Sequence, residues 1–439
     1  MEKTWGTDKM QSLALRLYGE QDIRLERFEL PEMTDDDILA DIVSNSICMS
    51  DYKAAIQGPR HKRVPKDVAQ HPTIIGLEFC GRLLKVGKNW RHKFRAGQKF
   101  SVQPALNVPG REVYTIGYAW QTIGGEATRI LIPKTVMDMD CLLPYDGDAY
   151  YKASLAEPLS CILGAFRSTY HYKLGEYELK MGVKDGGSMI ILAGTGPMGL
   201  GGVDLALHGK ENRPRRLVVT DIDPARLARA RQLFPAEAAR AAGVELHFVY
   251  TKGLYDPVQA LKALNEGQGF DDVFVFAPVA ALIEQASALL GFLGCLNFFA
   301  GPTDPKFKAP FNFYDVHYSG HHVVGSSGGN AKDMIDSIAL ASEGRVNPSV
   351  MVTHVGGLDA AREATLHLPE IPGGKKLIYT HVSMPLTALE DFARLGESDP
   401  FYAALACICD RNNGLWCEEA ERYLLAHAKR LEGDASADG

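Results

Sequence analysis

Apolar positions follow two different patterns along the 439-residue chain, and these patterns divide it into parts. In roughly the first 145 residues, short β-like runs are separated by Gly, Pro and Asp. Examples lie at 38–47, 73–87, 98–106 and 127–136. Short strands with frequent turn residues are typical of a barrel-like or sandwich β domain. The pattern therefore predicts a β-rich amino-terminal domain.

A second pattern begins at Ser188, where nearly continuous apolar strands alternate with helix-like stretches such as 224–234 and 280–290. Strands that are apolar on both faces and alternate with helices indicate a parallel sheet covered on both sides. We therefore expect an α/β, doubly wound sheet in this part. The predicted strands are 188–194, 216–223, 244–250, 271–277, 295–301 and 321–327.

The remaining segments suggest the domain boundaries. A helix-like stretch at 148–171 separates the two patterns, mixed structure follows Asn330, and the last stretch contains helix-like runs. A chain of this length exceeds one ordinary core, so two domains are expected. We predict a catalytic β domain over 1–158 that is completed by 330–385, a dinucleotide-binding domain over 159–329, and a helical extension over 386–439.

Composition narrows the class of protein. Hydrophobic residues make up 46% and charged residues 23% of the chain, as in an ordinary globular protein. The formal net charge of -7 argues against nucleic-acid binding, and no apolar run is long enough to span a bilayer. The first ten residues lack the layout of a signal peptide. Eight cysteines without a framework spacing favour a reducing compartment. We expect a cytoplasmic protein with a small-molecule substrate.

A glycine-rich turn lies at the first strand-to-helix junction of the second pattern. Gly194, Gly196 and Gly199 follow the G-x-G-x-x-G order, with Pro197 and Met198 between them. The glycines permit a tight turn, close approach of a pyrophosphate, and helix–strand packing. The helix N-terminus would present free N–H groups to the anion. The motif predicts a dinucleotide site.

Asp221 ends the next predicted strand, 22 residues after Gly199. A carboxylate at this position can accept hydrogen bonds from the ribose hydroxyls and repel a 2′-phosphate, so it favours NAD(H) over NADP(H). The alternative is that Asp221 caps the following helix. Arg226 lies five residues further on and leaves NADP(H) open.

Polar side chains with metal-binding chemistry follow the strands of the first domain. Cys48 ends one β-like run, Glu78 ends another, and Glu157 stands beside a proline at a helix start. A lone cysteine is usually a small buried hydrophobe. A thiolate and carboxylates gathered by the fold would suit a divalent metal, with zinc first.

Together these motifs resemble the zinc-type medium-chain dehydrogenase/reductase family of alcohol and polyol dehydrogenases. The resemblance spans about residues 12–382. Within the family, Glu157-Pro158, the chain length and "GSSGGN" look most like polyol and sugar-phosphate members. The resemblance to the family as a whole rests on the motifs "DILADIVSNSICMSD", "PTIIGLEFCGRLLKVG", "AGQKFSVQP", "AEPLS", "ILAGTGPMG", "VVTDID" and "GGKKLIY".

The resemblance implies a GroES-like catalytic domain and a Rossmann domain. It also implies hydride transfer between nicotinamide and a polyol or ketose phosphate such as L-sorbose 1-phosphate, and a homo-oligomer. By position, Cys48 would be a metal ligand, and Glu78 and Glu157 would be ligands or would hold the metal-bound water. Ser50 would relay the alcohol proton, and Asp51 would orient a ligand imidazole.

One residue departs from the family pattern: Leu77 stands where the family motif Gly-His-Glu has its histidine. Three explanations are open. Cys48, Glu78 and Glu157 hold the metal alone with water, or His71 or His61 reaches in from the preceding loop. In the third, the site is metal-free, in either a reductase that relies on hydrogen bonds or an inactive dinucleotide-binding relative.

The family's structural zinc is not expected here, because no cysteine lies between Cys80 and Cys141. The spacing of Cys407, Cys409 and Cys417 fits no structural-zinc pattern, so we expect these cysteines on packed helices.

A basic run, Arg60, His61, Lys62 and Arg63, lies between the Cys48 and Glu78 strands. Such a run is most often a solvated loop. Because the loop leaves and returns near the predicted site, Arg60, Lys62 and Arg63 are candidates for binding a substrate phosphate.

Overall fold

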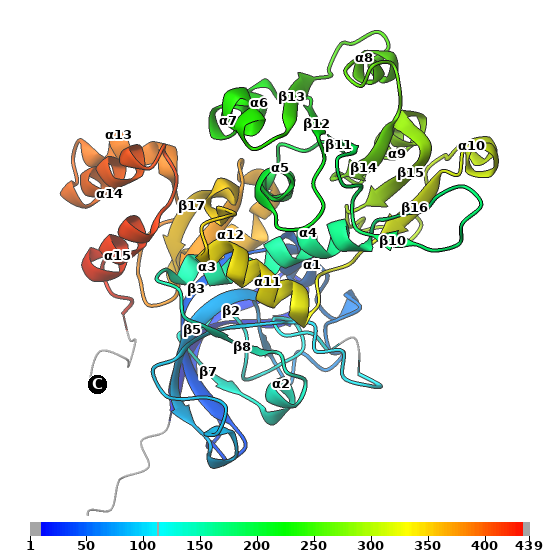
Figure 1. The fold of residues 1–439 in the computed structure, drawn as a ribbon. Helices are drawn as coiled ribbons and strands as arrows, with labels where there is room; N and C mark the ends of the chain where they lie inside the picture. The colour runs from blue at the N-terminus through cyan, green and yellow to red at the C-terminus, as the bar shows by residue number, and fades with distance from the viewer. Residues whose placement is uncertain (1–9, 112–113, 433–439) are drawn as a thin grey trace, which may run out of the picture. The chain divides into compact units, whose positions relative to one another are not determined.

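The computed structural model describes residues 10–111 and 114–432, which divide into two compact units (Figure 1). One unit combines Met1–Glu157 with Val352–Gly439, and the other is Pro158–Met351. The prediction about the amino-terminal leader falls almost entirely outside the described residues. Each unit is described below by itself.

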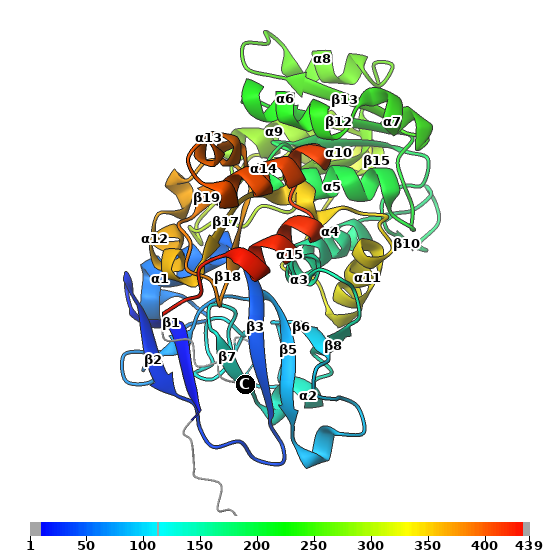
Figure 2. The same ribbon diagram turned by 90° about the vertical axis from the view of Figure 1, so that its left-hand side faces the viewer.

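The first unit contains an eight-stranded sheet in the order β19-β17-β18-β3-β5-β6-β8, with β7 also paired to β3. Figure 2 shows the long strands β3 and β5 side by side. A second sheet has the order β2-β1-β4. The strands are β1 (Gln11–Gly19), β2 (Asp22–Glu29), β3 (Ile38–Ile47), β4 (Thr73–Ile74), β5 (Glu78–Val86), β6 (Lys99–Val102), β7 (Arg129–Ile132), β8 (Leu142–Tyr145), β17 (Val352–Gly357), β18 (Lys375–Tyr379) and β19 (Thr387–Ala388).

Strand β3 is the centre of this unit, because its residues are buried along almost the whole strand. Its amino-terminal part contributes Ile38 and Ile42 to one apolar cluster, whereas Ile47 at its end joins another. Burial on both faces explains why the run reads as continuously apolar. The predicted β-rich domain is confirmed.

Short helices connect and flank these strands. Helix α1 follows directly after β3, and the predicted carboxy-terminal helices group with this unit. Cys407 and Cys409 lie on α14, and Cys417 is the N-cap of α15. The helices are α1 (Met49–Gln57), α2 (Lys134–Asp138), α3 (Tyr150–Ser154), α12 (Ala361–Leu366), α13 (Phe392–Gly396), α14 (Pro400–Arg411) and α15 (Glu418–His427).

The second unit is built on a six-stranded parallel sheet in the order β13-β12-β11-β14-β15-β16. The order reverses between β11 and β14, as in a doubly wound nucleotide-binding sheet. All of the predicted strands are confirmed. They are β11 (Ser188–Leu192), β12 (Arg216–Asp221), β13 (Glu245–Tyr250), β14 (Phe270–Val275), β15 (Leu290–Phe298) and β16 (His322–Gly325).

Helices accompany this sheet, and Figure 1 shows α6 and α7 next to β13. A two-stranded ribbon, β9 (Tyr170–His171) with β10 (Lys180–Met181), precedes β11. The helices are α4 (Ala156–Ser168), α5 (Pro197–His208), α6 (Pro224–Leu233), α7 (Ala236–Ala241), α8 (Pro257–Ala263), α9 (Ala280–Leu289), α10 (Phe313–Tyr318) and α11 (Ala331–Ser342).

The division of the chain differs from the expected one at residues 330–351, which group with the second unit. Ion pairs hold helix α11 against α4 of the second unit. Arg167 of α4 donates hydrogen bonds to Asp333 and Asp336 of α11, at 2.6 Å each. Sequence pattern alone does not show such ion pairs.

Among the described residues, no helix is long and apolar enough to cross a membrane.

Candidate functional site

The predicted glycine turn lies between the end of β11 and the start of α5, at the point where the strand order reverses. A side chain at Gly199 would lie 2.2 Å from the carbonyl oxygen of Gly194, so the helix packs too closely for any other residue. Gly196 instead faces open space. It is the N-cap of α5, Pro197 opens the helix, and no side chain caps it. Such an uncapped helix end suits a phosphate.

Asp221 lies at the end of β12, beside this turn, and is largely buried. Its carboxylate accepts a hydrogen bond from the Thr195 hydroxyl, the residue between the first two glycines. It also accepts the backbone N–H groups of Ile222 and Asp223 at 2.8 and 3.1 Å. The side chain is therefore held at the cofactor edge of the sheet. Asp223, and not Asp221, caps the following helix α6.

Cys48 lies just beyond the end of β3, where it is the N-cap of α1. Its sulfur accepts a hydrogen bond from the Ser50 hydroxyl at 2.9 Å. Asp51 accepts the Cys48 backbone N–H at 2.8 Å, which completes a capping box. Burial raises the pKa of the Cys48 thiol, and the neighbouring Glu78 and Asp51 raise it further against the opposing effect of Lys375.

Glu78 is fully buried and meets the ammonium group of Lys375. The sequence pattern placed Glu78 at the end of a β run, but it begins β5, because the chain leaves β4 after Ile74. Lys375 begins β18, so the two residues come from the strands on either side of β3. The ammonium donates to Oε1 of Glu78, while Oε2 is buried without a partner in the described structure.

Further acids are buried around this ion pair. Burial raises the pKa of Asp51 to about 8 and that of Glu126 to about 8. Asn45 donates a hydrogen bond to Glu126 at 2.8 Å. Both carboxyl groups therefore favour the protonated form more strongly than exposed acids do.

Glu157, the second residue of α4, is buried, and its charge acts on both Cys48 and Lys375. The fold thus brings Cys48, Ser50, Asp51, Glu78 and Glu157 into one region and adds Lys375, while the roles expected of these residues stay predictions. Burial by itself would lower the pKa of Lys375, but the adjacent carboxylate of Glu78 holds it above its usual value. The ammonium group is therefore charged.

Comparison with known proteins identifies the family. Residues 34–138 match the alcohol dehydrogenase GroES-like domain, and residues 197–343 match the zinc-binding dehydrogenase domain. The chain is 52% identical over 415 residues to mannitol-1-phosphate 5-dehydrogenase of Aliivibrio fischeri, covering 94% of this chain and 97% of that one. The chain belongs to the zinc-type alcohol dehydrogenase family.

Two further comparisons support this family assignment. L-Sorbose 1-phosphate reductase of Klebsiella pneumoniae is 50% identical over 421 residues, covering 96% of this chain and 99% of that one. The crystal structure of 2R,3R-butanediol dehydrogenase from Bacillus subtilis has a TM-score of 0.68 at 20% identity, covering 84% and 99% of the two chains. The GroES-like and Rossmann fold predictions are confirmed, and the protein is an oxidoreductase of the alcohol dehydrogenase type.

The residues of this chain do not form a complete binding site for the catalytic zinc of the family. A catalytic zinc needs three protein donors and an open position. Leu77 is buried in an apolar cluster with Ile75 and Tyr118 and offers no donor. Among residues 10–111 and 114–432, no three His, Cys, Asp or Glu side chains are grouped so that they could hold a metal ion. Glu78 already binds an ammonium group instead.

The two histidines considered as replacements are placed differently. The His61 ring lies 5.7 Å from that of Tyr118, and its Nδ1 faces the backbone N–H of Arg63 at 3.3 Å. Burial lowers the pKa of His61. His71 is exposed before β4. In this structure neither imidazole stands in for the one that Leu77 replaces.

The basic loop runs from the 3-10 turn Gly58–Arg60 toward Val64. Arg60 is exposed and forms an ion pair with Glu20. Lys62 is exposed and Arg63 is half-buried. The loop therefore presents Lys62 to solvent, while Arg60 is already engaged by a carboxylate.

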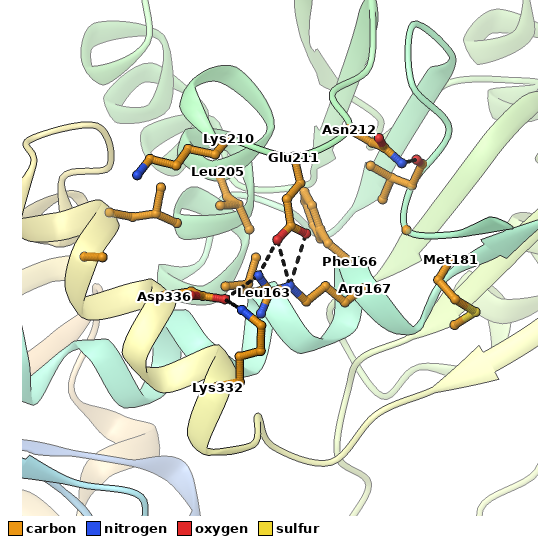
Figure 3. A pocket seen from close by; sticks show the side chains of 15 residues that line it. Leu163, Phe166, Arg167, Met181, Leu205, Lys210, Glu211, Asn212, Lys332 and Asp336 are labelled. Carbon is orange, nitrogen blue, oxygen red and sulfur yellow. Dashed lines mark hydrogen bonds and ion pairs between the residues drawn. The ribbon is translucent and has the colours of Figure 1, made fainter. Parts of the chain in front are cut away.

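A cavity of about 600 Å³ lies in the second unit, at the carboxy-terminal end of α5 and away from the glycine turn (Figure 3). Leu163, Phe166 and Leu205 contribute its apolar lining. Its central cation, Arg167, is shared among Glu211, Asp333 and Asp336. The residues predicted to bind cofactor, substrate or metal do not line it.

Three residues that contribute to the sites went unrecognised in the sequence. Lys375 belongs to the quoted "GGKKLIY" motif, but lysines are seldom buried, and its partner is 297 residues away. Thr195 occupies a variable position of the glycine motif. Glu126 follows two glycines on a loop, a context that gives no sign in the sequence that the carboxyl group is buried against Asn45.

Proposed function

We propose that this enzyme is an NAD(H)-dependent oxidoreductase that interconverts a ketose phosphate, such as L-sorbose 1-phosphate, and a polyol phosphate. The observation that carries the proposal is the glycine turn at the switch point of a doubly wound sheet, with Asp221 fixed beside it. The full-length relatives named for mannitol 1-phosphate and L-sorbose 1-phosphate support the substrate class.

The preference for NAD(H) rests on the surroundings of Asp221. Its carboxylate is held by Thr195, Ile222 and Asp223, so its negative charge stays where a 2′-phosphate would lie. Arg226 is exposed and its guanidinium lies 3.6 Å from Asp223, so it is a cation beside this turn that could oppose the preference by contacting a 2′-phosphate.

Cys48, Ser50 and Asp51 form the proposed reaction side of the site, with Glu78 and Glu157 beside them. Nicotinamide would supply the hydride chemistry when bound. The Ser50 hydroxyl is a proton carrier in this arrangement, and Asp51 holds the turn that carries Cys48 and Ser50. The catalytic zinc expected from the resemblance is not part of the proposal, because the donor set is incomplete.

The substrate phosphate is assigned to the basic loop. Lys62 is exposed, Arg63 stands next to it, and Arg60 can exchange its surface pair with Glu20 for a phosphate. Exposed ion pairs contribute little free energy, so such an exchange is inexpensive.

A homo-oligomer forms part of the proposal. Strand β16 is an edge strand, and Val323 on it is exposed. Exposed aromatic residues follow on the neighbouring helix α10, namely Phe313, Tyr314 and Tyr318. An exposed apolar edge is a typical surface for pairing with a second copy. The cytoplasm is the proposed compartment, in line with the eight free cysteines.

The function is tested by measuring NADH and NADPH oxidation with a panel of ketose phosphates and their unphosphorylated analogues. We expect turnover with a phosphorylated ketose and NADH. Absence of turnover with every phosphate, by a folded protein that still binds NADH, would leave the alternative of an inactive dinucleotide-binding relative.

A further inference from the structure

Lys375 lies at a special position of the first unit. Strand β18 pairs with β3 through Lys376 and Ile47, and β3 pairs with β5 through Ser46 and Glu78. The start of β18, the end of β3 and the start of β5 therefore meet at one end of the sheet. The Lys375 side chain crosses the end of β3, next to Cys48, to reach Glu78.

This placement puts a fixed positive charge among the side chains that the family resemblance assigns to a metal. The exposed fractions of the Lys375 and Glu78 side chains are only 7% and 1%. A divalent cation on the same carboxylate would bring like charges together in a poorly solvated region, where their repulsion is weakly screened. The ammonium binds only Oε1 of Glu78, but its charge opposes a second cation at Oε2, so the ammonium and a metal ion compete for this carboxylate.

The set of possible metal ligands leads to the same conclusion. Leu77 points into the apolar cluster that contains Ile75 and Ile378, so the missing imidazole has been replaced by packing and not by another ligand. A buried charge needs a partner, and Lys375 provides one for Glu78. The negative charge of Glu78 is balanced within the chain itself.

We propose that the Lys375 ammonium takes the place of the divalent metal in this protein, and that the Cys48–Glu78–Glu157 cluster binds no zinc. The part that concerns catalysis rests on the proposed function: the enzyme works without a metal ion. The part that concerns metal binding stands independently of any substrate.

Metal content tests the proposal directly. The purified full chain is dialysed against excess Zn²⁺, desalted and analysed by plasma mass spectrometry. We expect far less than one zinc per chain in the wild type, and about one per chain in Leu77→His/Lys375→Met, which restores the imidazole and frees Glu78. Lys376→Met is the matched control, because Lys376 is also buried but donates to the backbone carbonyls of Ile371, Pro372 and Gly374.

Two outcomes of the metal analysis would overturn the proposal. Stoichiometric zinc in the wild type would show that the ammonium does not exclude the metal. Equal zinc binding by Leu77→His alone and by the double variant would show that Lys375 is irrelevant to metal binding. Wild-type metal content needs no variant, so misfolding of a variant leaves the test intact.

Catalysis is tested separately with wild-type enzyme treated with a chelator and desalted. We expect an unchanged rate of NADH oxidation with the phosphorylated ketose. An inactive protein without zinc contradicts the proposed function and leaves the metal inference standing. An active protein whose activity falls with chelation and returns with Zn²⁺ contradicts the inference and supports the function.

Discussion

The carboxylate of Glu421 accepts the backbone N–H of Tyr151 at 2.8 Å, across 270 residues of sequence. It also accepts the N–H of Tyr150 at 2.6 Å, so it caps helix α3, whose own N-cap has no side-chain hydrogen bond. The Tyr379 hydroxyl donates to Glu421 and accepts from the Trp416 indole at 2.8 Å. The carboxy-terminal helices are thus an integral part of the first unit.

The first prediction concerns the pH dependence of stability. Burial raises the pKa of Glu421 from 4.5 to about 7, so the folded state favours the protonated carboxyl. The corresponding stabilisation is complete below pH 4.5 and is lost as the pH rises through about 7. It amounts to about 3 kcal/mol. Glu421→Gln should therefore flatten the dependence of the unfolding free energy on pH between 5 and 8, measured by urea denaturation.

Glu419→Gln is the control for this prediction, because Glu419 is exposed on the same helix and pairs with Arg411. Glu421→Ala should be less stable than Glu421→Gln at pH 5, by about 1–3 kcal/mol, because Gln keeps one oxygen that can accept a backbone N–H of α3 and Ala keeps none. An unaltered pH profile in Glu421→Gln would contradict the assignment.

Cofactor choice provides the second prediction. Asp221→Ala removes the charge that opposes a 2′-phosphate, so the ratio of kcat/KM for NADPH to that for NADH should rise at least about tenfold. Thr195→Val removes the hydroxyl that holds Asp221. It should weaken NADH binding, measured by fluorescence titration.

Thr251→Val is the matched control, because the Thr251 hydroxyl contacts only the backbone carbonyl of Asp221, at 3.4 Å. If Asp221→Ala and Thr251→Val gave the same cofactor ratio, the carboxylate would not be what discriminates between the cofactors.

The basic loop leads to the third prediction. Lys62→Ala should raise KM for a phosphorylated ketose about tenfold and leave KM for the unphosphorylated analogue unchanged, because only the phosphate contact is lost. Lys88→Ala serves as control, since Lys88 is an exposed lysine of the same unit that pairs with Asp35. Equal effects on both substrates would point to a change in loop structure instead.

Ser50 provides the fourth prediction. Ser50→Ala removes the hydroxyl that donates to Cys48 and that we assign to proton transfer. The value of kcat should fall about 100-fold or more with little change in NADH affinity. Ser168→Ala, whose hydroxyl donates to the backbone carbonyl of Ala165, should behave as the wild type. A change in KM with an unchanged kcat would instead show that the Ser50 hydroxyl has only a structural role.

The parts that the sequence predicts best are those set by local patterns. The six parallel strands and the glycine turn follow from hydrophobic periodicity and from backbone requirements that neighbouring residues reveal. Cys48, Glu78 and Glu157 were found because each follows or precedes a recognisable element. Their chemistry depends on distant residues, so their partners were not found.

Lys375 and Glu421 show why the remainder escapes a sequence analysis. Both are charged residues in segments that look like ordinary strand and helix, and both are buried by contacts made 270 or more residues away. Burial of a charge depends on tertiary pairing and leaves no periodic signal. The carboxy-terminal helices appeared to be an appendage for the same reason.

The topology of the two units has a consequence for the order of events during synthesis. The second unit is one continuous segment, Pro158–Met351, and all its strands have been synthesised before β17 is made. The first unit needs β18 beside β3 and Glu421 on α3, so its earlier half waits for the last segment of the chain. The nascent protein therefore carries a finished nucleotide-binding unit while an open edge of β3 still awaits its partner strand.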